Sequence, residues 1–567
     1  MKLLPLALLL LPVNANVGTQ FVKLEAAISR GDTFKDSVRG AKPYMLEKRA
    51  DDGSVTMELK NTQSFYEVEL GMGSDNQTVG VLLDTGSSDL WVMNSNNSYC
   101  SSNSNKKRGL ALEKRGRSLQ DLRNLNVSPG KAVQRADTTE TRTEFFGGNE
   151  ATSSVAAEAT LDCSKYGTFD PDSSNSFHKN GTDFAITYAD KTFANGVWGY
   201  DDISFGGVTV EDFSFAVADD TDSEMGVFGI GFRELETTYS SNTSETPYIY
   251  QNLPFKLVDQ GLTNKAAYSV YLNSSDASTG TVLFGAVDHS KYTGTLGLVP
   301  IINTAASAGY KNPIQLEITL SAITASDGSG SQASVGVGAA AALFDTGTTL
   351  TYAPSDIIEQ IAELFQLQYS SSAGAYVTKC SSVEDYTLNF DFQGQVIEAP
   401  LSSFLVSLQT NSGSTSSYCA LGIFSSGDSS FTLGDSFLQN VYFVADLEDY
   451  QLAVAPVNLS ASSEDLEAIT SGIPSASSVS AYSSTWGVSA SALDVDASTS
   501  LASITSVAST KAAASTVVSD GSISVSSSTS SSSSSSSGSG SKAEAGTISK
   551  SVGAIVFALV VATVVIG

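Results

Sequence analysis

Two similar stretches of sequence, far apart in the chain, constrain the fold more than any other feature. They read VGVLLDTGSSDLWV, which contains Asp84, and AAALFDTGTTLTYA, which contains Asp345. In each stretch an apolar run of the kind typical of a buried strand ends in Asp-Thr-Gly. The glycine permits a tight turn after the strand. The repetition therefore predicts two lobes of similar construction, each with an aspartate at the end of a buried strand.

The chain between about residues 61 and 458 has the pattern of an all-β protein. Short apolar and β-branched runs, such as DFAITYAD and VYFVADLEDYQLAVA, alternate with Gly, Asn, Asp and Ser. The clearest helix is predicted over residues 355–368, where apolar residues recur at helical spacing. We therefore expect an all-β, bilobal fold, with lobes over residues 50–255 and 256–458 and an active-site cleft between them.

The two aspartates are the candidate catalytic residues. If the lobes are related by a pseudo-twofold axis and meet at the repeated stretches, Asp84 faces Asp345. Two carboxyl groups in contact hold one proton between them and titrate as a coupled pair. Such a pair provides a base that deprotonates a water molecule and an acid that polarises a peptide carbonyl. The alternative is a pair of aspartate-capped turns in repeated β units.

The residues after each aspartate are expected to support it. The hydroxyl residue three positions on can bond to the outer carboxylate oxygen, the threonine can lock the two loops together, and the glycine permits the turn. These residues are Thr85, Gly86 and Ser87 in the first stretch and Thr346, Gly347 and Thr348 in the second.

Both ends of the chain differ in composition from the middle. Residues 1–15 have the lysine, apolar run and small-residue cleavage site of a secretory signal peptide. Residues 459–537 are rich in Ser, Thr and Ala and predict an O-glycosylated stalk. Residues 538–567 combine small residues, a polar spacer and an apolar tail, which predicts a glycosylphosphatidylinositol (GPI) anchor attached at Gly538. A short tail-anchored helix is the alternative.

The four cysteines are typical of a chain that folds in an oxidising compartment. Three pairings are possible, and the order along the chain favours Cys100–Cys163 and Cys380–Cys419, one in each half. Seven Asn-x-Ser/Thr sequons also fit a secreted surface. They are Asn76, Asn96, Asn126, Asn180, Asn242, Asn273 and Asn458.

Two segments are candidates for proteolytic cleavage. Residues 16–49 are polar and end in Lys48 and Arg49, which predicts a pro-segment that is removed at this dibasic site. Residues 101–162 form a basic insert in an otherwise acidic chain. The insert is either a solvated loop or a cleavable one, in which case a cut leaves two polypeptides joined by a disulfide. Its candidate cleavage positions are Lys106, Lys107, Arg108, Lys114 and Arg115.

The net charge of −29 has two interpretations: solubility at a cell surface, or attraction for basic substrates. Nucleic acid is a poor partner for so acidic a chain, because its phosphates repel it. With only two histidines, His178 and His289, and no clustered ligands, we expect no metal site and no organic cofactor.

The repeated stretches resemble those of the pepsin-like aspartic proteases, and the resemblance covers about residues 64–456. AITYADKTFANG resembles the hairpin, or flap, that covers the active site in this family, with Tyr188 as its tyrosine and Trp91 as the partner of that tyrosine. GVFGIGF and FTLGDSFLQNVYFVAD resemble the hydrophobic-hydrophobic-Gly elements beneath the two catalytic loops. The resemblance implies an acid endopeptidase in which Asp84 and Asp345 are the catalytic pair.

The surrounding features resemble those of the yapsins, which are fungal surface aspartic proteases, and YCSSNS and VLFGAVDHSKYTGTL add to the likeness. That resemblance implies cleavage after single or paired Lys or Arg, with Asp190 and Glu224 as the candidate acidic residues of the pocket. It also implies a monomer, or a two-chain disulfide-linked form, held at the plasma membrane or in the cell wall, where glucan is a candidate partner. The alternatives are a non-catalytic glycosylated wall protein on the same fold and a protease of broad hydrophobic specificity.

Overall fold

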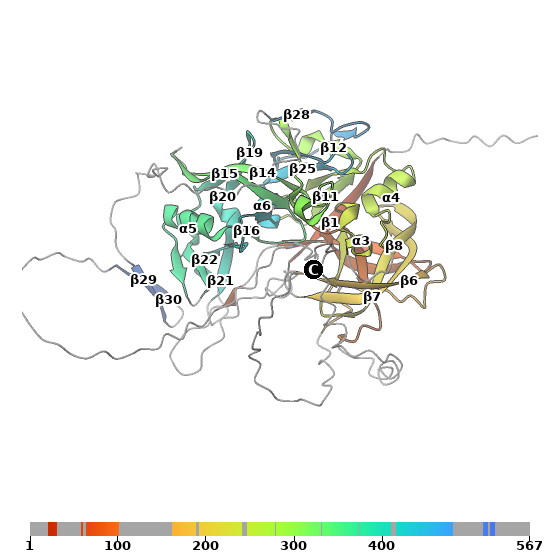
Figure 1. Cartoon of the computed structure of the whole chain (residues 1–567). Coiled ribbons are helices and arrows are strands. Elements are labelled where there is room, and N and C mark those ends of the chain that lie inside the picture. Colours follow the sequence, from red (N-terminus) through yellow and green to blue (C-terminus); the bar gives the residue numbers. More distant parts are fainter. Residues whose placement is uncertain are drawn as a thin grey trace, which may run out of the picture.

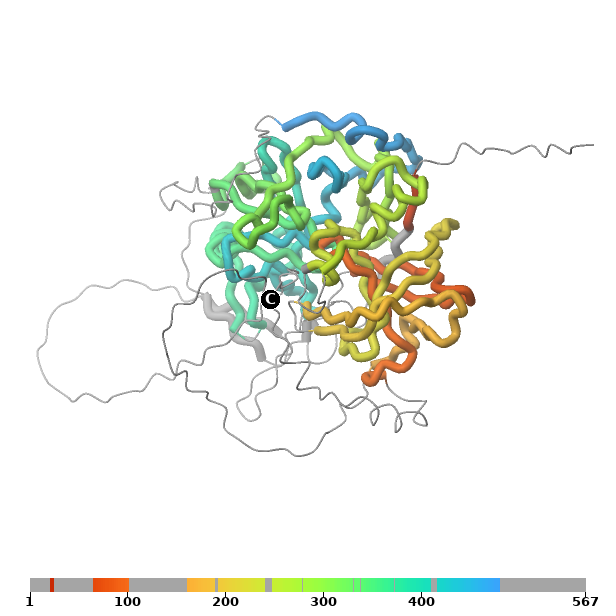
Figure 2. The backbone as a smooth tube through the Cα atoms, turned by 45° about the vertical axis from the view of Figure 1, so that its right-hand side comes forward, coloured from red at the N-terminus to blue at the C-terminus, as the bar shows by residue number. Residues whose placement is uncertain are grey.

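The computed structural model describes residues 21–30, 58–59, 64–100, 161–188, 192–240, 247–277, 279–329, 331–371, 373–409, 415–479, 514–519 and 522–527. These residues form two β-rich lobes, one orange to yellow and the other green to cyan (Figures 1 and 2). The all-β, bilobal fold predicted from the repeated stretches is confirmed. The predicted sites outside the described residues are the signal peptide, Lys48, Arg49, Lys106, Lys107, Arg108, Lys114, Arg115, Asn126, Asn242, Asp190 and Gly538.

One large sheet runs through both lobes. Its strands are β1 (Val22–Arg30), β3 (Ser64–Met72), β4 (Gln77–Asp84), β5 (Leu90–Met93), β6 (His178–Thr187), β7 (Phe193–Phe205), β8 (Val208–Thr221), β9 (Gly226–Gly229), β10 (Ala267–Tyr271), β11 (Thr279–Phe284), β13 (Leu296–Pro300), β25 (Val441–Asp446), β26 (Gln451–Pro456) and β28 (Ala476–Ser478). They pair in the order β28-β13-β26-β25-β10-β11-β1-β3-β4-β9-β5-β8-β7-β6. Strand β1 comes from the predicted pro-segment and lies between β3 and β11, in the middle of this sheet.

The second lobe adds two further sheets. A seven-stranded sheet has the order β20-β19-β14-β15-β24-β16-β23, and a five-stranded sheet has the order β17-β18-β22-β21-β2. Their strands are β2 (Glu58–Leu59), β14 (Glu317–Ser326), β15 (Gln332–Phe344), β16 (Thr351–Ala353), β17 (Gln368–Ser370), β18 (Ala375–Lys379), β19 (Thr387–Phe392), β20 (Gln395–Pro400), β21 (Leu405–Gln409), β22 (Thr415–Leu421), β23 (Ile423–Ser425) and β24 (Phe431–Leu433).

Strand pairing around the repeated stretches shows the pseudo-twofold relation. Strand β9 is parallel to β4 and antiparallel to β5. Strand β24 is likewise parallel to β15 and antiparallel to β16. The last six residues of β4 are all buried, as expected for an apolar run in the interior of a lobe. Each lobe therefore carries its aspartate out of the core on a rigid strand.

Helices are short and few among the described residues. They are α3 (Thr237–Ser240), α4 (Leu253–Asp259), α5 (Ser355–Leu364) and α6 (Asp435–Leu438), with 3₁₀ turns η1 (Arg233–Leu235), η2 (His289–Lys291), η3 (Thr304–Ala308), η4 (Cys380–Ser382) and η5 (Leu401–Phe404). The helix predicted over residues 355–368 ends four residues early. Gln366 adopts a left-handed backbone with φ of 54°, which ends the helix, and β17 begins two residues later.

Both predicted disulfides are present, Cys100–Cys163 in the first lobe and Cys380–Cys419 in the second. The Cα atoms of Cys100 and Cys163 are 5.4 Å apart. The basic insert therefore leaves the lobe and returns to it at one place.

The predicted start of the stalk at residue 459 is wrong, because the chain stays on the second lobe as far as Val479. We call residues 459–479 the C-terminal segment; it lies along the top of the molecule, coloured blue in Figure 2. Its strand β27 (Leu466–Ala468) pairs with β12 (Ala286–Asp288), and β28 pairs with β13. Ile469 is fully buried, and Ile473 is largely buried beside it. A few well-placed apolar residues thus hold a segment whose composition predicted a stalk.

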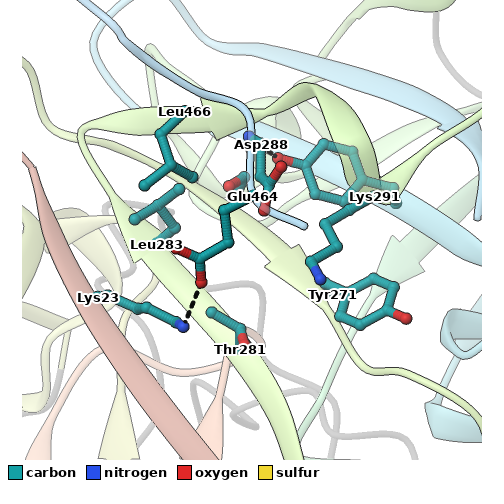
Figure 3. Close-up of a pocket in the computed structure, with 10 residues that line it drawn as sticks. Lys23, Tyr271, Thr281, Leu283, Asp288, Lys291, Glu464 and Leu466 are labelled. Atoms are coloured by element: carbon teal, nitrogen blue, oxygen red, sulfur yellow. Dashed lines mark hydrogen bonds and ion pairs between the residues drawn. The ribbon is translucent and has the colours of Figure 1, made fainter. Parts of the chain in front are cut away.

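Polar contacts reinforce this attachment. The Ser290 hydroxyl donates to the carbonyl of Ser463 at 2.6 Å, and the His289 amide donates to the carbonyl of Asp465 at 2.8 Å. A small cavity lies where β1, β11 and the C-terminal segment meet (Figure 3). Beside it the Lys23 ammonium of β1 donates to the Glu464 carboxylate at 2.6 Å. The C-terminal segment thus touches both the second lobe and the predicted pro-segment.

Further along the predicted stalk, the structure describes a short antiparallel pair. It consists of β29 (Ala514–Ser519) and β30 (Ser522–Ser527). Both strands contain β-branched residues, which favour extended pairing.

Candidate active site

The two aspartates lie where the lobes meet, and the hydrogen bonds around Asp84 match those around Asp345. The Gly86 amide donates to Asp84 Oδ1 at 2.8 Å, and the Ser87 hydroxyl donates to Asp84 Oδ2 at 2.5 Å. Both aspartate side chains are almost completely buried.

The second half repeats this arrangement around Asp345. The Gly347 amide donates to Asp345 Oδ1 at 2.8 Å, and the Thr348 hydroxyl donates to Asp345 Oδ2 at 2.7 Å. These bonds orient each carboxyl group from outside, so that the two groups are aimed at one another.

The threonines after the aspartates bond across the two lobes. The Thr85 amide donates to Thr346 Oγ1 at 3.1 Å, and the Thr346 amide donates to Thr85 Oγ1 at 3.0 Å. Each hydroxyl in turn donates to a carbonyl of the opposite lobe: Thr85 to Phe344 at 2.8 Å and Thr346 to Leu83 at 3.0 Å. Four buried bonds therefore hold the two loops at a defined separation.

The glycines of the two loops leave room for the aspartate of the opposite lobe. A Cβ atom added to Gly86 would lie 2.6 Å from Asp345 Oδ1. A Cβ atom added to Gly347 would lie 2.4 Å from Asp84 Oδ1. Only glycine lets the loops approach this closely, which gives these positions a steric reason besides the turn.

Burial and the neighbouring carboxylate determine the electrostatics of the pair. Burial, followed by the charge of Asp84, holds the pKa of Asp345 well above its usual range, although bonds from Thr348 and Gly347 oppose the shift. Asp345 is therefore the member that holds a proton. A pair with one proton has an acid and a base at adjacent positions, as water activation requires.

Asp435, at the start of α6, is a buried acid that the sequence interpretation did not single out. Its amide donates to the carbonyl of Thr348 at 2.8 Å, while its carboxyl oxygens have no hydrogen-bond partner among the residues that the structure describes. Burial, and then the charge of Asp345, raises the pKa of Asp435 well above its usual range. A neutral Asp435 thus lies behind the Asp345 loop.

A second unpredicted group lies behind the Asp84 loop. Asp89 and Glu236 are both buried, and both bond to Tyr250: its hydroxyl donates to Asp89 Oδ1 at 2.9 Å and its amide donates to Glu236 Oε2 at 2.8 Å. In the sequence, isolated acidic residues are usually exposed, so nothing but their later partners distinguishes these two.

The hairpin of β6 and β7 carries Tyr188, and the structure places it beside Trp91. The Trp91 indole nitrogen donates to the Tyr188 hydroxyl at 2.6 Å. The residues at the tip, including Asp190, lie outside the described part of the chain. The predicted pairing of tyrosine and tryptophan is present in the geometry.

The acidic residues that precede the predicted pocket have partners in the structure. Asp219 accepts a bond from Asn94, Asp220 accepts one from Ser98, and Asp222 accepts one from the Phe193 amide. Glu224 is partly exposed, with its carboxylate 3.9 Å from the Lys165 ammonium. These residues shape the loops near the hairpin, and Glu224 faces a cation.

Five of the seven sequons are described. Asn76 and Asn96 are exposed. The side-chain amides of the other three donate within the chain: Asn180 to the Tyr248 hydroxyl, Asn273 to the Thr279 carbonyl, and Asn458 to the Ser290 carbonyl. Glycosylation at each stays a prediction. Within the described residues no helix is long and apolar enough to cross a membrane.

Comparison with known proteins gives long matches. The model of the family "Eukaryotic aspartyl protease" matches residues 65–457. Aspartic proteinase 3 of Saccharomyces cerevisiae is 43% identical over 488 residues, which cover 83% of this chain and 84% of that protein. Aspartic proteinase yapsin-3 of the same yeast is 34% identical over 79% of each chain. Secreted aspartic protease 9 of Candida albicans is 35% identical over 84% of this chain and 92% of its own length.

The family match covers both aspartates and both threonine loops, and the relatives cover most of the chain on either side. Together with the paired carboxyl groups, these matches show that the chain belongs to the eukaryotic aspartyl protease family, in its yapsin group, and is an aspartic-type endopeptidase.

Proposed function

We propose that Asp84 and Asp345 cleave peptide bonds by activating a water molecule held between them. The observation that carries this proposal is the symmetric support of two buried carboxyl groups across the contact of the lobes. Asp84 takes a proton from the water, the resulting hydroxide attacks the peptide carbonyl, and Asp345 gives its proton to the carbonyl oxygen. Collapse of the tetrahedral species then releases the amine, which takes the proton from Asp84, while a hydroxyl of the tetrahedral species returns a proton to Asp345 and so regenerates the pair.

The preferred substrates are proteins cleaved at single or paired Lys or Arg. A carboxylate in a partly desolvated pocket favours such a side chain through a charge-assisted hydrogen bond. Glu224 is a candidate for this role. Its carboxylate lies 3.9 Å from the Lys165 ammonium, and a basic side chain of the substrate can compete with Lys165 for it. Asp190 is the other candidate from the sequence. The net charge of −29 favours basic substrates over a longer range.

The protein is secreted and retained at the cell surface. Its signal peptide, stalk and GPI anchor signal support this location, and one of its relatives is named a secreted protease.

It is made as a zymogen that is cut after Lys48 and Arg49. It acts as a monomer, or as two chains joined by the Cys100–Cys163 disulfide if the insert is cut. Surface and secreted proteins are its substrates in processing, shedding and maintenance of the cell wall, where glucan is a candidate partner.

A peptide library tests the activity and the specificity together. The enzyme is incubated with the library at about pH 4 to 6, where the raised pKa of Asp345 favours a proton on the pair, and the cuts are mapped by mass spectrometry. Cuts after Lys or Arg that are absent from Asp84→Asn are expected. Glu224→Gln and Asp190→Asn should each weaken cleavage at basic sites more than at apolar ones.

Other outcomes separate the alternatives. Cuts after bulky apolar residues would keep the catalytic pair and contradict the acidic pocket. No cleavage by the enzyme after removal of its pro-segment would favour the non-catalytic wall protein.

A further inference from the structure

The loop that carries Asp84 is bonded from behind by the segment around β9. The Ile230 amide donates to the carbonyl of Asp84 at 2.9 Å, and the Gly231 amide donates to the carbonyl of Ser87 at 2.8 Å. The Gly229 amide donates to the carbonyl of Asp89 at 2.9 Å. The position of the loop thus depends on the chain that follows β9.

The side chain of Asp89 connects the loop to the next layer. Its Oδ2 accepts a bond from the Thr237 amide at 2.9 Å, and its Oδ1 accepts a bond from the Tyr250 hydroxyl at 2.9 Å. Glu236, the neighbour of Thr237, accepts the bond from the Tyr250 amide. Asp89 is 3% exposed and Glu236 is 0% exposed, so two acidic side chains share one tyrosine away from water.

Packed rings connect the same tyrosine to the hairpin over the site. The Tyr250 ring lies 5.1 Å from that of Trp198 on β7, which lies 5.5 Å from that of Phe184 on β6. Trp91, the partner of Tyr188, belongs to the same buried cluster. Movement of Tyr250 would therefore disturb both the loop of Asp84 and the base of the hairpin.

The charged groups around Asp89 and Glu236 offset only a small part of the cost of ionising these two buried carboxyl groups. Arg233 on η1 lies with its guanidinium 4.0 Å from the Phe255 ring and donates to Gln251. Burial, and then the charge of Asp89, oppose ionisation of Glu236 more strongly than the Tyr250 amide and the Arg233 guanidinium favour it, and the charge of Glu234 adds a smaller opposing effect. The pair also faces Tyr250, whose phenol stays neutral because burial and the charges of Asp89 and Glu236 raise its pKa well above its usual range.

We propose that Asp89 and Glu236 form a proton-holding carboxyl pair that positions the Asp84 loop and the base of the hairpin, and that it releases both as protons are lost. The two residues are positioning residues that act through Tyr250. The effect on catalysis rests on the proposed role of Asp84, whereas the effect on stability does not.

The direction of the pH effect follows from burial. Burial raises the pKa of Asp89 to about 6 and that of Glu236 to about 10. Because both folded-state values are above those of the unfolded chain, the stabilisation is complete in acid. It declines through Asp89 and Glu236 together as the pH rises to about 6, and through Glu236 alone above that.

The test compares full-length Glu236→Gln and Asp89→Asn with wild type, and uses Glu211→Gln, an exposed site on β8, as the matched control. The melting temperature is followed between about pH 4 and 8. Glu236→Gln should reduce its decline over the whole range, and Asp89→Asn only up to about pH 6. Proton release on unfolding at neutral pH, measured by calorimetry in two buffers, should fall by about one in Glu236→Gln.

Activity gives a second measurement. In both variants the fall of kcat/KM on the alkaline side should move upward by about half a unit or more, with the acidic side unchanged. If both variants follow the control in melting temperature and proton release, the proposal is wrong. If one variant does not fold, the other decides alone, since each removes one of the two charges. Unaltered stability with lost activity would instead point to a direct role in the catalytic loop.

Discussion

Behind Asp84 the repeated stretch continues to Asp89, whereas the corresponding position behind Asp345 is Leu350. In the elements beneath the loops the difference is reversed: the second half has the acidic residue and the first half has the apolar one. Pairing of β9 with β4 and of β24 with β15 aligns Phe228 with Leu433, so that Ile230 corresponds to Asp435.

Each half therefore contains a buried acid close to its catalytic loop, but on a different element: Asp89 on the loop before β5 and Asp435 at the start of α6. In the first half it lies on the loop itself and bonds to Tyr250; in the second it lies beneath the loop, and its carboxyl oxygens have no hydrogen-bond partner among the described residues. The pseudo-twofold symmetry is therefore strict where the aspartates are oriented and relaxed one layer further out.

Replacement of either catalytic aspartate should have the largest effect on activity. Asp84→Asn and Asp345→Asn should each lower kcat/KM by about 10²–10⁴-fold or more, because one carboxyl group cannot be acid and base at once. The loss is measured on a cleaved peptide, with thermal melting as the control for folding. A variant that kept most of its activity would show that the two halves are not equivalent in the reaction.

The loop glycines test whether each half constrains the aspartate of the other. Gly86→Ala should displace Asp345, and Gly347→Ala should displace Asp84, because the added methyl group overlaps the opposite carboxyl group. A displacement near 1 Å lowers the rate by about 10²-fold. Rates and crystal structures of both variants check this. Full activity in either variant would contradict the close approach of the loops.

The threonines test the bonds between the lobes. Thr85→Val and Thr346→Val each leave a buried amide and a buried carbonyl without their partners, at a cost of about 1–3 kcal/mol of unfolding free energy. Denaturant unfolding should give similar losses for both, and Thr209→Val on the surface of β8 serves as control. A large loss of unfolding free energy in only one variant would show that the two threonines do not contribute equally to the contact between the lobes.

The acid beneath the second loop should have the smallest effect. Since the pKa of Asp435 is raised, its contribution to stability is present in acid and is lost as the pH rises. Asp435→Asn should match wild type near pH 4 and exceed it by about 1 kcal/mol near neutrality. Ile230→Asn, the corresponding change in the first half, should destabilise at every pH. Identical pH profiles of stability for Asp435→Asn and wild type would contradict this assignment.

The inner layer could be predicted from sequence because it is local. Each aspartate, its glycine and its hydroxyl residue lie within four positions, and the second copy confirms the pattern of the first. The outer layer depends on contacts between distant segments. Asp89 and Tyr250 are 161 positions apart, and no local pattern marks either. The composition of residues 459–479 predicts a stalk, because their few apolar residues, such as Ile469, become buried only by packing against the second lobe.

The disulfide between Cys100 and Cys163 has a consequence for how such a chain can diversify. The Leu161 amide donates to the carbonyl of Tyr99 at 3.0 Å, so the two ends of the insert lie side by side on the lobe. Doubling the length of a loop with joined ends costs only about 0.6 kcal/mol of closure entropy. Insertions, deletions and substitutions between Cys100 and Cys163 can therefore accumulate with little effect on the catalytic centre. New cleavage sites can arise there in the same way.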